Sequence, residues 1–404
     1  MTIPCALPRS LQAYRYHPAP SASSRPVRGR LAPSPTGYMH LGNAWAFLLA
    51  WLAVRSAGGT LVLRMEDIDP QRSRPEYARA LVEDLRWLGL DWDEGPAVDG
   101  AIPDAGDMAE QGPCGPYFQS ARTALYDATL DAMDRAGLVY PCYCTRKELR
   151  QLAGAPHVDD AGAPYPGTCR HLSPEERRQR EARGRRACLR LRCPEGRFHF
   201  QDGLLGEQSF TLEDCGGDFA LRRSDGVVAY QLAVALDDAL MGITQVVRGR
   251  DILTSTPRQL ALLRLWGFEP PAYAHIPLLL DGQGERLAKR HQSLGVRELR
   301  RQGVQVSYAM DENQARSGNP DYIVTGTVEQ AWLREVSATE LATSMRATYR
   351  LAPRSGRVVK ETLNSSQNRS GIPTGGAAEE IMLNSMRELV QPMARKIKAI
   401  VDGK

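Results

Sequence analysis

The chain has 404 residues, of which 42% are hydrophobic and 24% are charged, and its formal net charge is +4. This length exceeds one average domain, so we expect a main domain of ~250 residues with smaller parts attached. The small net charge gives no sign of a uniformly basic nucleic-acid binder, and no apolar run reaches the ~20 residues that a membrane-spanning helix needs.

The first 27 residues contain proline, serine and arginine but no apolar segment of the kind found in secretory signals. We expect a disordered leader over residues 1–27, with a transit peptide as the alternative. The eight cysteines are unevenly spread, which is typical of a reducing compartment with a local metal site. We therefore expect a cytoplasmic protein that does not interact with membranes.

Residues 30–43 predict a strand, a tight loop and the start of a helix. A short apolar run ends at two prolines, the chain turns through Gly37 and Gly42, and an apolar segment follows over residues 44–54. This order places His40 and free backbone N–H groups at a helix N-terminus, which favours anionic ligands. The alternative for His40 is a histidine packed in the core.

Acidic residues follow the next predicted strand, over residues 60–64. Open α/β sheets bind ligands just beyond the carboxyl ends of their strands, which is where Glu66, Asp67 and Asp69 lie. These residues could also cap the helix predicted over residues 74–88. Asp69 suits that role, whereas Glu66 comes too early for it, so we expect Glu66 in a site.

Three cysteines after a predicted strand at residues 138–140 have a spacing that suits a metal. Cys142 and Cys144 lie together, and Cys169 returns about two dozen residues later, which predicts a zinc knuckle. The alternative is a set of small buried thiols without metal. The fourth ligand is open among three side chains: Tyr165, His157 and His171.

Arginines are dense over residues 170–197, which contain a charged helix predicted at residues 174–184. A solvated charged face is the default interpretation of such a run. Contact with tRNA phosphates is the alternative.

The second half of the chain predicts further α/β elements. A hairpin is expected over residues 219–233, a strand ending in a charged turn over 242–251, and a helix over 254–266. A strand over residues 276–280 then leads into a Gly-rich turn that carries Lys289. This order again places a charged group at a ligand-binding edge, although Lys289 could also be an ordinary surface lysine.

Taken together, these segments resemble class I aminoacyl-tRNA synthetases of the glutamyl type. Residues 34–43 resemble the HIGH signature of that family, with Asn43 in place of its last histidine, and residues 286–290 resemble its KMSKS loop. Residues 64–70 and 230–251 also match glutamyl-type patterns. The resemblance implies a Rossmann-type α/β catalytic domain that activates an amino acid with ATP and Mg²⁺.

The resemblance also implies roles for individual residues. His40, Gly42 and Lys289 would bind ATP, with His40 and Lys289 as the catalytic pair that stabilises charge on the phosphates. Glu66 would bind the ammonium group of L-glutamate, and either Arg30 or Arg248 would bind its side-chain carboxylate. The full implied glutamate site is Arg30, Ala32, Ser34, Glu66, Tyr230 and Arg248.

Two features resemble one subfamily, the glutamyl-Q tRNA(Asp) synthetases. Only about a hundred residues follow the KMSKS-like loop, and the spacing of Cys142, Cys144, Tyr165 and Cys169 matches the zinc pattern of that subfamily. The resemblance implies one structural Zn²⁺ per chain, a monomer, and transfer of glutamate to the queuosine base of tRNA(Asp). The alternatives are a glutamyl-tRNA synthetase with a reduced anticodon-binding region and a catalytically silent paralogue that binds amino acid or tRNA.

The expected domain organisation follows from the same resemblance, which fades after about residue 303. The tail would be mainly helical, with helices over residues 328–349 and 377–401 around a polar linker at 353–376. In chain order, we expect a leader (1–27), a first catalytic half (28–137), an inserted zinc-binding, acceptor-like subdomain (138–215), a second catalytic half (216–303) and the tail (304–404).

Overall fold

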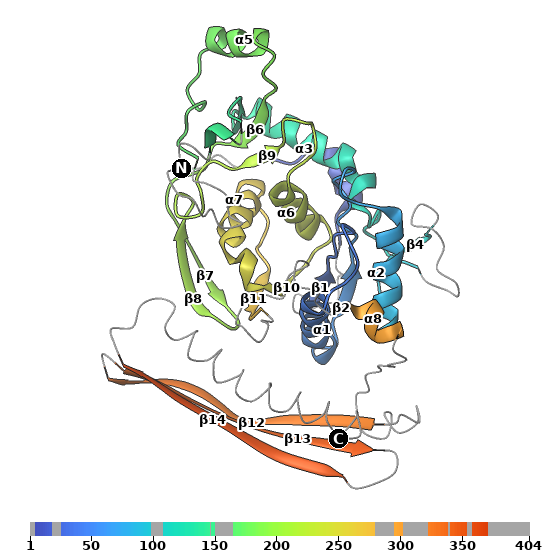
Figure 1. Ribbon diagram of the computed structural model, residues 1–404. Coiled ribbons are helices and arrows are strands. Elements are labelled where there is room, and N and C mark those ends of the chain that lie inside the picture. The colour runs from blue at the N-terminus through green and yellow to red at the C-terminus, as the bar shows by residue number, and fades with distance from the viewer. Residues whose placement is uncertain are drawn as a thin grey trace. The chain divides into compact units, whose positions relative to one another are not determined.

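The chain divides into two compact units, Met1–Gln305 and Val306–Lys404, in the computed structural model (Figure 1). The structure describes residues 5–17, 26–97, 108–145, 147–149, 165–278, 295–301, 322–337, 340–353 and 358–370. No helix within these residues is long and apolar enough to cross a membrane.

The first unit begins with two parallel strands joined by a helix. β1 (Arg28–Leu31) pairs with β2 (Thr60–Leu63), and Arg30 lies opposite Val62. α1 (Leu41–Ser56) connects the two strands, as the sequence predicts. Both strands are almost completely buried because they pack against α1 on an apolar cluster that includes Leu31, Trp51, Val54, Leu61 and Leu63.

A second set of parallel strands continues this α/β arrangement. β10 (Gln245–Gly249) lies beside β1, where the backbone N–H of Thr244 donates to the Arg28 carbonyl at 2.8 Å. β10 pairs in parallel with β11, and the sheet order continues through β7 to β8. The remaining strands of this sheet are β11 (Ala272–Ile276), β7 (Arg197–Asp202) and β8 (Gly206–Thr211).

Helices cover these strands, and their ends follow local sequence signals. α7 (Thr256–Trp266) starts with a proline in its first turn and ends at Gly267, whose φ of +72° suits glycine. The other helices of this unit are η1 (Arg9–Tyr14), α2 (Pro75–Trp87), η3 (Gln119–Arg122), α3 (Thr123–Arg135), α6 (Tyr230–Leu240), η4 (Arg250–Ser255) and α8 (Val296–Arg301).

A small antiparallel sheet carries Cys142 and Cys188, and helix α5 (Pro174–Ala182) projects beyond this sheet (Figure 1). The sheet order is β5–β6–β9, and α5 lies between β5 and β6 in the sequence. The strands are β5 (Val139–Cys142), β6 (Cys188–Leu191) and β9 (Ala220–Arg222), and a separate pair is formed by β3 (Gly95–Pro96) and β4 (Glu110–Gln111).

Two expectations for the first unit are wrong. Residues 5–17 are not a disordered leader, because Cys5 and Leu11 are buried in the main apolar cluster and the Cys5 N–H donates to the Leu265 carbonyl. The hairpin predicted over residues 219–233 is also incomplete. After a single bridge between Arg222 and Val228, helix α6 begins at Tyr230, because burial of seven consecutive residues (232–238) outweighs the β propensity of the run.

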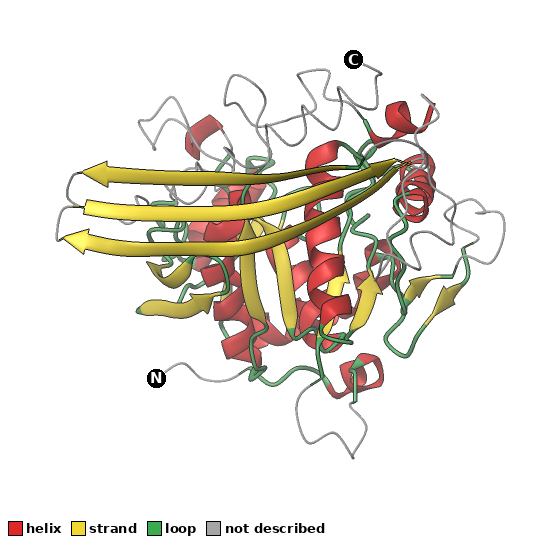
Figure 2. Ribbon diagram, turned by 90° about the horizontal axis from the view of Figure 1, so that it is seen from below, coloured by secondary structure: helices red, strands yellow, loops and turns green. Residues whose placement is uncertain are grey.

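The prediction of a mainly helical tail is wrong for the described residues. Three antiparallel strands lie between residues 322 and 370 (Figure 2). Residues 345–351 alternate apolar and polar side chains, which is the period of a strand and not of the predicted helix. Part of the predicted linker is also strand, and the helix predicted over residues 377–401 lies outside the described residues. The strands are β12 (Tyr322–Ser337), β13 (Glu340–Pro353) and β14 (Val359–Ser370).

Candidate active site

A cleft of about 280 Å³ lies at the carboxyl ends of β1, β10 and β11 and at the start of α1. The structure brings together all the described residues that the sequence predicted for the ATP and glutamate sites. Their roles stay predictions, and Lys289 with the rest of residues 286–290 lies outside the described residues. The predicted residues that line the cleft are Arg30, Ala32, Ser34, His40, Gly42, Glu66, Tyr230 and Arg248.

Parallel pairing of β1 with β2 explains why the segments that follow them meet. The Arg64 N–H donates to the Leu31 carbonyl, and the Glu66 N–H donates to the Pro33 carbonyl, both at 2.9 Å. The backbone after β2 therefore runs alongside the loop that carries Ser34. Residues 30 and 66, far apart in the sequence, end up on one edge of the fold.

Buried charges surround Glu66. The Arg64 guanidinium donates to Glu66 at 3.2 Å and to Asp238 at 2.7 Å. Burial raises the pKa of the Glu66 carboxyl, although Arg64 and Arg30 act against this shift. Burial and the Glu66 carboxylate likewise raise the pKa of Tyr230. This edge of the cleft therefore offers a carboxyl group and a phenol hydroxyl to a ligand.

Arg30 is held loosely in comparison with its neighbours. Its Nε lies 3.5 Å from Asp238, and its Nη1 donates to the Val247 carbonyl at 3.5 Å. The buried Nε makes no hydrogen bond to the described residues. The guanidinium thus keeps donors that a ligand carboxylate in the cleft can use.

Arg248 is held tightly by three side chains that sequence reasoning missed. Its Nε donates to His275 at 3.0 Å, its Nη1 to Gln259 at 2.8 Å and its Nη2 to Thr256 at 2.7 Å. The Tyr273 ring lies beneath the guanidinium, 5.1 Å away. His275 was detectable only as a histidine within an apolar strand, and the other two belong to the predicted helix.

A buried carboxylate orients the histidine behind Arg248. Asp202 Oδ2 lies 2.5 Å from His275 Nδ1, and Asp202 Oδ1 accepts the His275 N–H at 3.1 Å. Burial lowers the pKa of His275 despite its hydrogen bond to Asp202. A neutral ring that donates from Nδ1 must accept at Nε2, which is the nitrogen facing Arg248. Register confirms the arrangement, since His275 on β11 pairs with Arg248 on β10.

His40 caps helix α1 at the opposite wall of the cleft. Its Nδ1 accepts the backbone N–H of Asn43 at 3.3 Å. This bond places the ring proton of the neutral form on Nε2, which makes that nitrogen a donor. The backbone of Asn43 makes this contact, so a change of side chain at that position leaves it intact.

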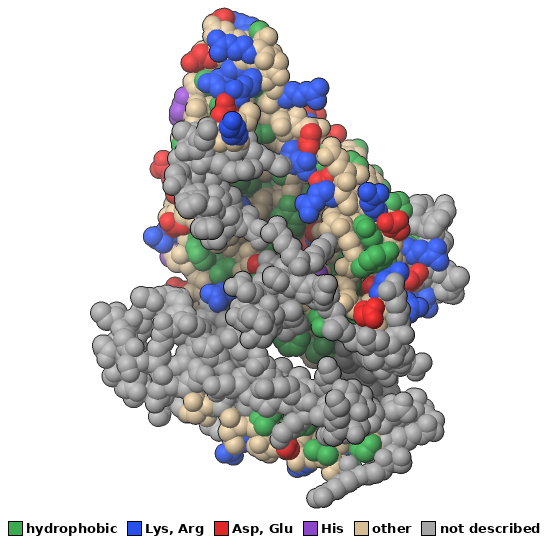
Figure 3. Space-filling view, viewed as in Figure 1, with side chains coloured by type: hydrophobic (Ala, Val, Ile, Leu, Met, Phe, Trp, Pro, Cys, Tyr) green, Lys and Arg blue, Asp and Glu red, His purple; other side chains and the backbone are tan. Residues whose placement is uncertain are grey.

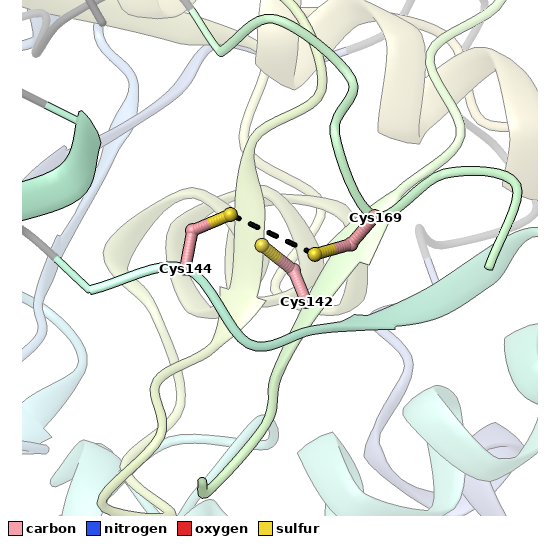
Figure 4. Close-up of side chains that lie close together, drawn as sticks. All are labelled: Cys142, Cys144 and Cys169. Carbon is pink, nitrogen blue, oxygen red and sulfur yellow. Dashed lines mark hydrogen bonds between the residues drawn. The ribbon is translucent and has the colours of Figure 1, made fainter. Parts of the chain in front are cut away.

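Cys142, Cys144 and Cys169 lie within 4.8 Å of one another through their sulfur atoms (Figure 4). Cys144 and Cys169 are 3.6 Å apart, and either thiol can donate to the other. Such a set of thiols from two returning segments could hold a metal ion. It is the only cluster of this kind among the described histidine, cysteine and acidic side chains.

Tyr165 adjoins this cysteine cluster. Its hydroxyl accepts the Cys169 N–H at 2.7 Å, and its ring lies 3.9 Å below the Arg190 guanidinium. His171 is not part of the cluster, and His157 lies outside the described residues. Cys188, which sequence reasoning did not select, lies opposite Cys142 on the adjacent strand.

Residues 26–315 match the family described as tRNA synthetases class I (E and Q), catalytic domain. The chain belongs to this family. The match confirms the predicted class I catalytic domain with mixed α/β content, because it spans the cleft and both sets of parallel strands.

Two synthetases are similar to this chain over most of their own length. The glutamyl-Q tRNA(Asp) synthetase of Nitratidesulfovibrio vulgaris is 65% identical over 278 residues, which are 69% of this chain and 82% of that protein. The glutamyl-Q tRNA(Asp) synthetase of Symbiobacterium thermophilum is 51% identical over 277 residues, or 68% and 82% of the two chains.

Glutamate–tRNA ligases match over a smaller share of their length. Glutamate–tRNA ligase 2 of Acidithiobacillus ferrooxidans is 44% identical over 310 residues, which are 76% of this chain and 61% of that protein. The crystal structure of a glutamate tRNA ligase from Elizabethkingia meningosepticum in complex with its amino acid has a TM-score of 0.53 and 28% identity. The match covers 71% of this chain and 55% of the chain in that crystal structure.

Proposed function

We propose that this class I synthetase activates L-glutamate with ATP and transfers the glutamyl group to the queuosine base of tRNA(Asp). The supporting observation is the 65% identity to a glutamyl-Q tRNA(Asp) synthetase, of which the chain covers 82%. The chain covers only 61% of the glutamate–tRNA ligase from A. ferrooxidans. The higher identity to the glutamyl-Q tRNA(Asp) synthetase favours the tRNA-modifying activity over charging of a tRNA 3′ end.

In the proposed first step, the α-carboxylate of glutamate attacks the α-phosphorus of ATP, and pyrophosphate leaves. His40 Nε2 and the backbone N–H groups at the start of α1 would stabilise the charge that grows on the α-phosphate. Gly42 lines the same wall, where a side chain would narrow the approach of the phosphates. Lys289 would bind the leaving pyrophosphate, and Mg²⁺ enters with ATP.

Glutamate would bind between the charged residues on the opposite wall. Glu66 would pair with its ammonium group, and Arg30 would bind its side-chain carboxylate. Arg30 suits this role because it still has N–H donors for a ligand, whereas those of Arg248 are hydrogen-bonded to protein side chains. Arg248 would then act as a fixed wall that orients the substrate together with Tyr230. The backbone of residues 32–34 completes the site.

In the proposed second step, a hydroxyl of queuosine attacks the carbonyl carbon of the glutamyl-adenylate. An ester forms, and AMP leaves with the electron pair of the broken C–O bond. The glutamyl-adenylate would stay in the same cleft during both steps, so the same side chains would bind it in each.

We propose that Cys142, Cys144, Cys169 and Tyr165 hold one structural zinc ion. Zinc accepts this donor set in a tetrahedral site, and it would cross-link residues 142–144 to residues 165–169, which return to them before α5. The buried Arg190 beside Tyr165 would offset part of the negative charge that three thiolates and a phenolate leave around Zn²⁺. The ion has no place in the chemical steps.

The test is glutamate transfer with radiolabelled glutamate, ATP and tRNA(Asp) with or without queuosine. We expect label only on the queuosine-containing tRNA, with the adenosine 3′ end still open to periodate oxidation. Label on the 3′ end of tRNA(Glu) would instead identify a charging enzyme. Absence of ATP–pyrophosphate exchange with glutamate would identify a silent paralogue.

A further inference from the structure

Helix α8, which lies beside α2, contacts the loop that carries His40 (Figure 1). We call residues 38–40 the His40 loop. Gly295, directly before α8, forms an antiparallel bridge with His40 itself. The Val296 N–H donates to the Met39 carbonyl at 3.1 Å, and both residues are buried. The backbone of the His40 loop is therefore held by a segment that comes from the far end of the catalytic domain.

Arg297 of α8 joins this segment to α2. Its Nη2 donates to Glu83 at 2.8 Å, and its Nε lies 3.7 Å from Asp84. The guanidinium also lies over the Tyr38 ring, 4.8 Å from the ring centre. Because Tyr38 is the first residue of the His40 loop, one side chain links α2, α8 and that loop.

The Tyr38 ring depends on these neighbours for its position. It is 50% exposed, so the apolar core does not hold it. Its edge meets the ring of Tyr77 on α2, with ring centres 5.0 Å apart and ring planes at 82°. Arg297 covers one face, in the geometry of a cation–π contact. Tyr38 itself lines the cleft, so a shift of this ring would reach the wall that carries His40.

Stability of the fold does not explain the charges between α2 and α8. Both carboxylate oxygens of Asp84 and the Nε of Arg297 are buried and make no hydrogen bond to the described residues. A buried ionic contact of this kind adds little stability, and an apolar pair would pack at least as well. Figure 3 shows acidic and basic side chains close together over these two helices. A role in positioning gives a reason for them.

We propose that Arg297 is a positioning residue for adenylate formation, which holds the His40 loop so that His40 Nε2 faces the α-phosphate of ATP. This inference rests on the proposed function, because it takes His40 as the group that stabilises charge on that phosphate. Arg297 is not among the described residues that line the cleft, so it acts through the loop and not on the substrate. Small displacements of a catalytic group are costly, which makes such a support effective.

The first experiment measures ATP–pyrophosphate exchange with ATP and glutamate varied separately. In Arg297→Gln, we expect kcat to fall about 10- to 100-fold, because His40 loses its fixed position. The KM for glutamate should stay within about twofold of the native value, since the charged residues proposed to bind glutamate lie on the opposite wall. Arg300→Gln is the matched control. Arg300 lies on the same helix, 48% exposed and 3.7 Å from the same Glu83, and its loss should leave kcat unchanged.

The second experiment repeats the change in a His40→Asn background. Asparagine is a good N-cap residue and can still accept the Asn43 N–H, so α1 stays capped. If Arg297 acts through His40, Arg297→Gln should lower kcat by no more than about twofold in this background. A further loss as large as the one in the native background would overturn the proposal, because it would show general damage to the domain.

Hydrogen exchange of the substrate-free protein gives a measurement that does not depend on catalysis. Amides of residues 38–44 should exchange at least about 10-fold faster in Arg297→Gln, because the His40 loop opens more often. If that variant does not fold, Arg297→Lys replaces it. Lysine keeps the charge beside Glu83 and Asp84 but cannot lie flat on the Tyr38 ring, so a smaller effect in the same direction is expected.

Native kcat and native amide exchange in a folded Arg297 variant would refute the positioning role. Absence of ATP–pyrophosphate exchange in the native protein would instead refute the proposed function, and amide exchange would still decide whether Arg297 holds the His40 loop.

Discussion

The buried pair of Asp202 and His275 offers a sharp test of how the cleft is organised. In the Asp202→Asn variant, the amide Oδ1 can still accept the His275 backbone N–H, so the loop at the end of β7 should persist. The new NH₂ group would donate to His275 Nδ1 where the carboxylate accepted. The imidazole then has to carry its proton on Nε2. In the native protein this nitrogen accepts from the Arg248 Nε at 3.0 Å, so in the variant two N–H donors would face each other.

The expected loss follows from one hydrogen bond to a charged group. Such a bond is worth about 1.5–3 kcal/mol, which corresponds to a factor of about 10–150 in affinity. Arg248 would keep its bonds to Gln259 and Thr256 but lose its fixed orientation. We therefore expect the KM for glutamate to rise by about 10- to 100-fold, whereas the KM for ATP should change little.

The assay is ATP–pyrophosphate exchange with glutamate and ATP varied separately. Glu207→Gln, an exposed acid on the neighbouring strand β8, is the matched control, and the melting temperature reports on the fold. An unchanged KM for glutamate in a folded Asp202→Asn protein would refute the reasoning. Equal rises in both KM values would show general damage to the cleft.

Three further predictions concern stability, the metal and the second signature. Asp84 is buried without a hydrogen bond to the described residues, and burial raises its pKa to about 6 despite the nearby Arg297. The folded state then holds this proton more tightly than the unfolded state, so Asp84 should make the protein less stable as pH rises from about 4 to about 6, and the effect should level off above that pH. Asp84→Asn should remove roughly 3 kcal/mol of that dependence in denaturant titrations, and parallel curves for both proteins would contradict it. Cys144→Ser, or a strong chelator, should remove about one zinc per chain by elemental analysis and weaken tRNA binding more than adenylate formation. A fully folded native preparation without metal would contradict the zinc site. Lys289→Ala should abolish ATP–pyrophosphate exchange while circular dichroism stays native, and unchanged exchange would refute its role.

The main features of the catalytic half could be predicted because its signals are local. The strand, loop and helix around His40, and the strand before Glu66, each depend on neighbours within a dozen residues. Residues at the ends of parallel strands must meet at one edge of the sheet, so topology alone brought Arg30 and Glu66 together. The same kind of local signal placed α5.

The tail shows where local signals mislead. Residues 328–349 contain many residues with high helix propensity, yet they form parts of two paired strands. Strand pairing explains the outcome: β13 pairs with both β12 and β14, and Tyr349 and Leu351, two residues apart on β13, are buried. A propensity of a few tenths of a kcal/mol per residue is easily overridden by such packing.

The sequence by itself determined the family, the α/β catalytic domain and eight of the residues that line the cleft, because each is encoded in a short motif. Only the tertiary structure decided the environment of each charge. Asp202, Arg248 and His275 come from three strands spread over more than seventy residues, and their hydrogen bonds depend on how β7, β10 and β11 align. Packing likewise decided that Arg30, and not Arg248, has N–H donors left for a ligand. No local pattern contains that information, because it depends on distances between segments that the chain brings together only when it folds.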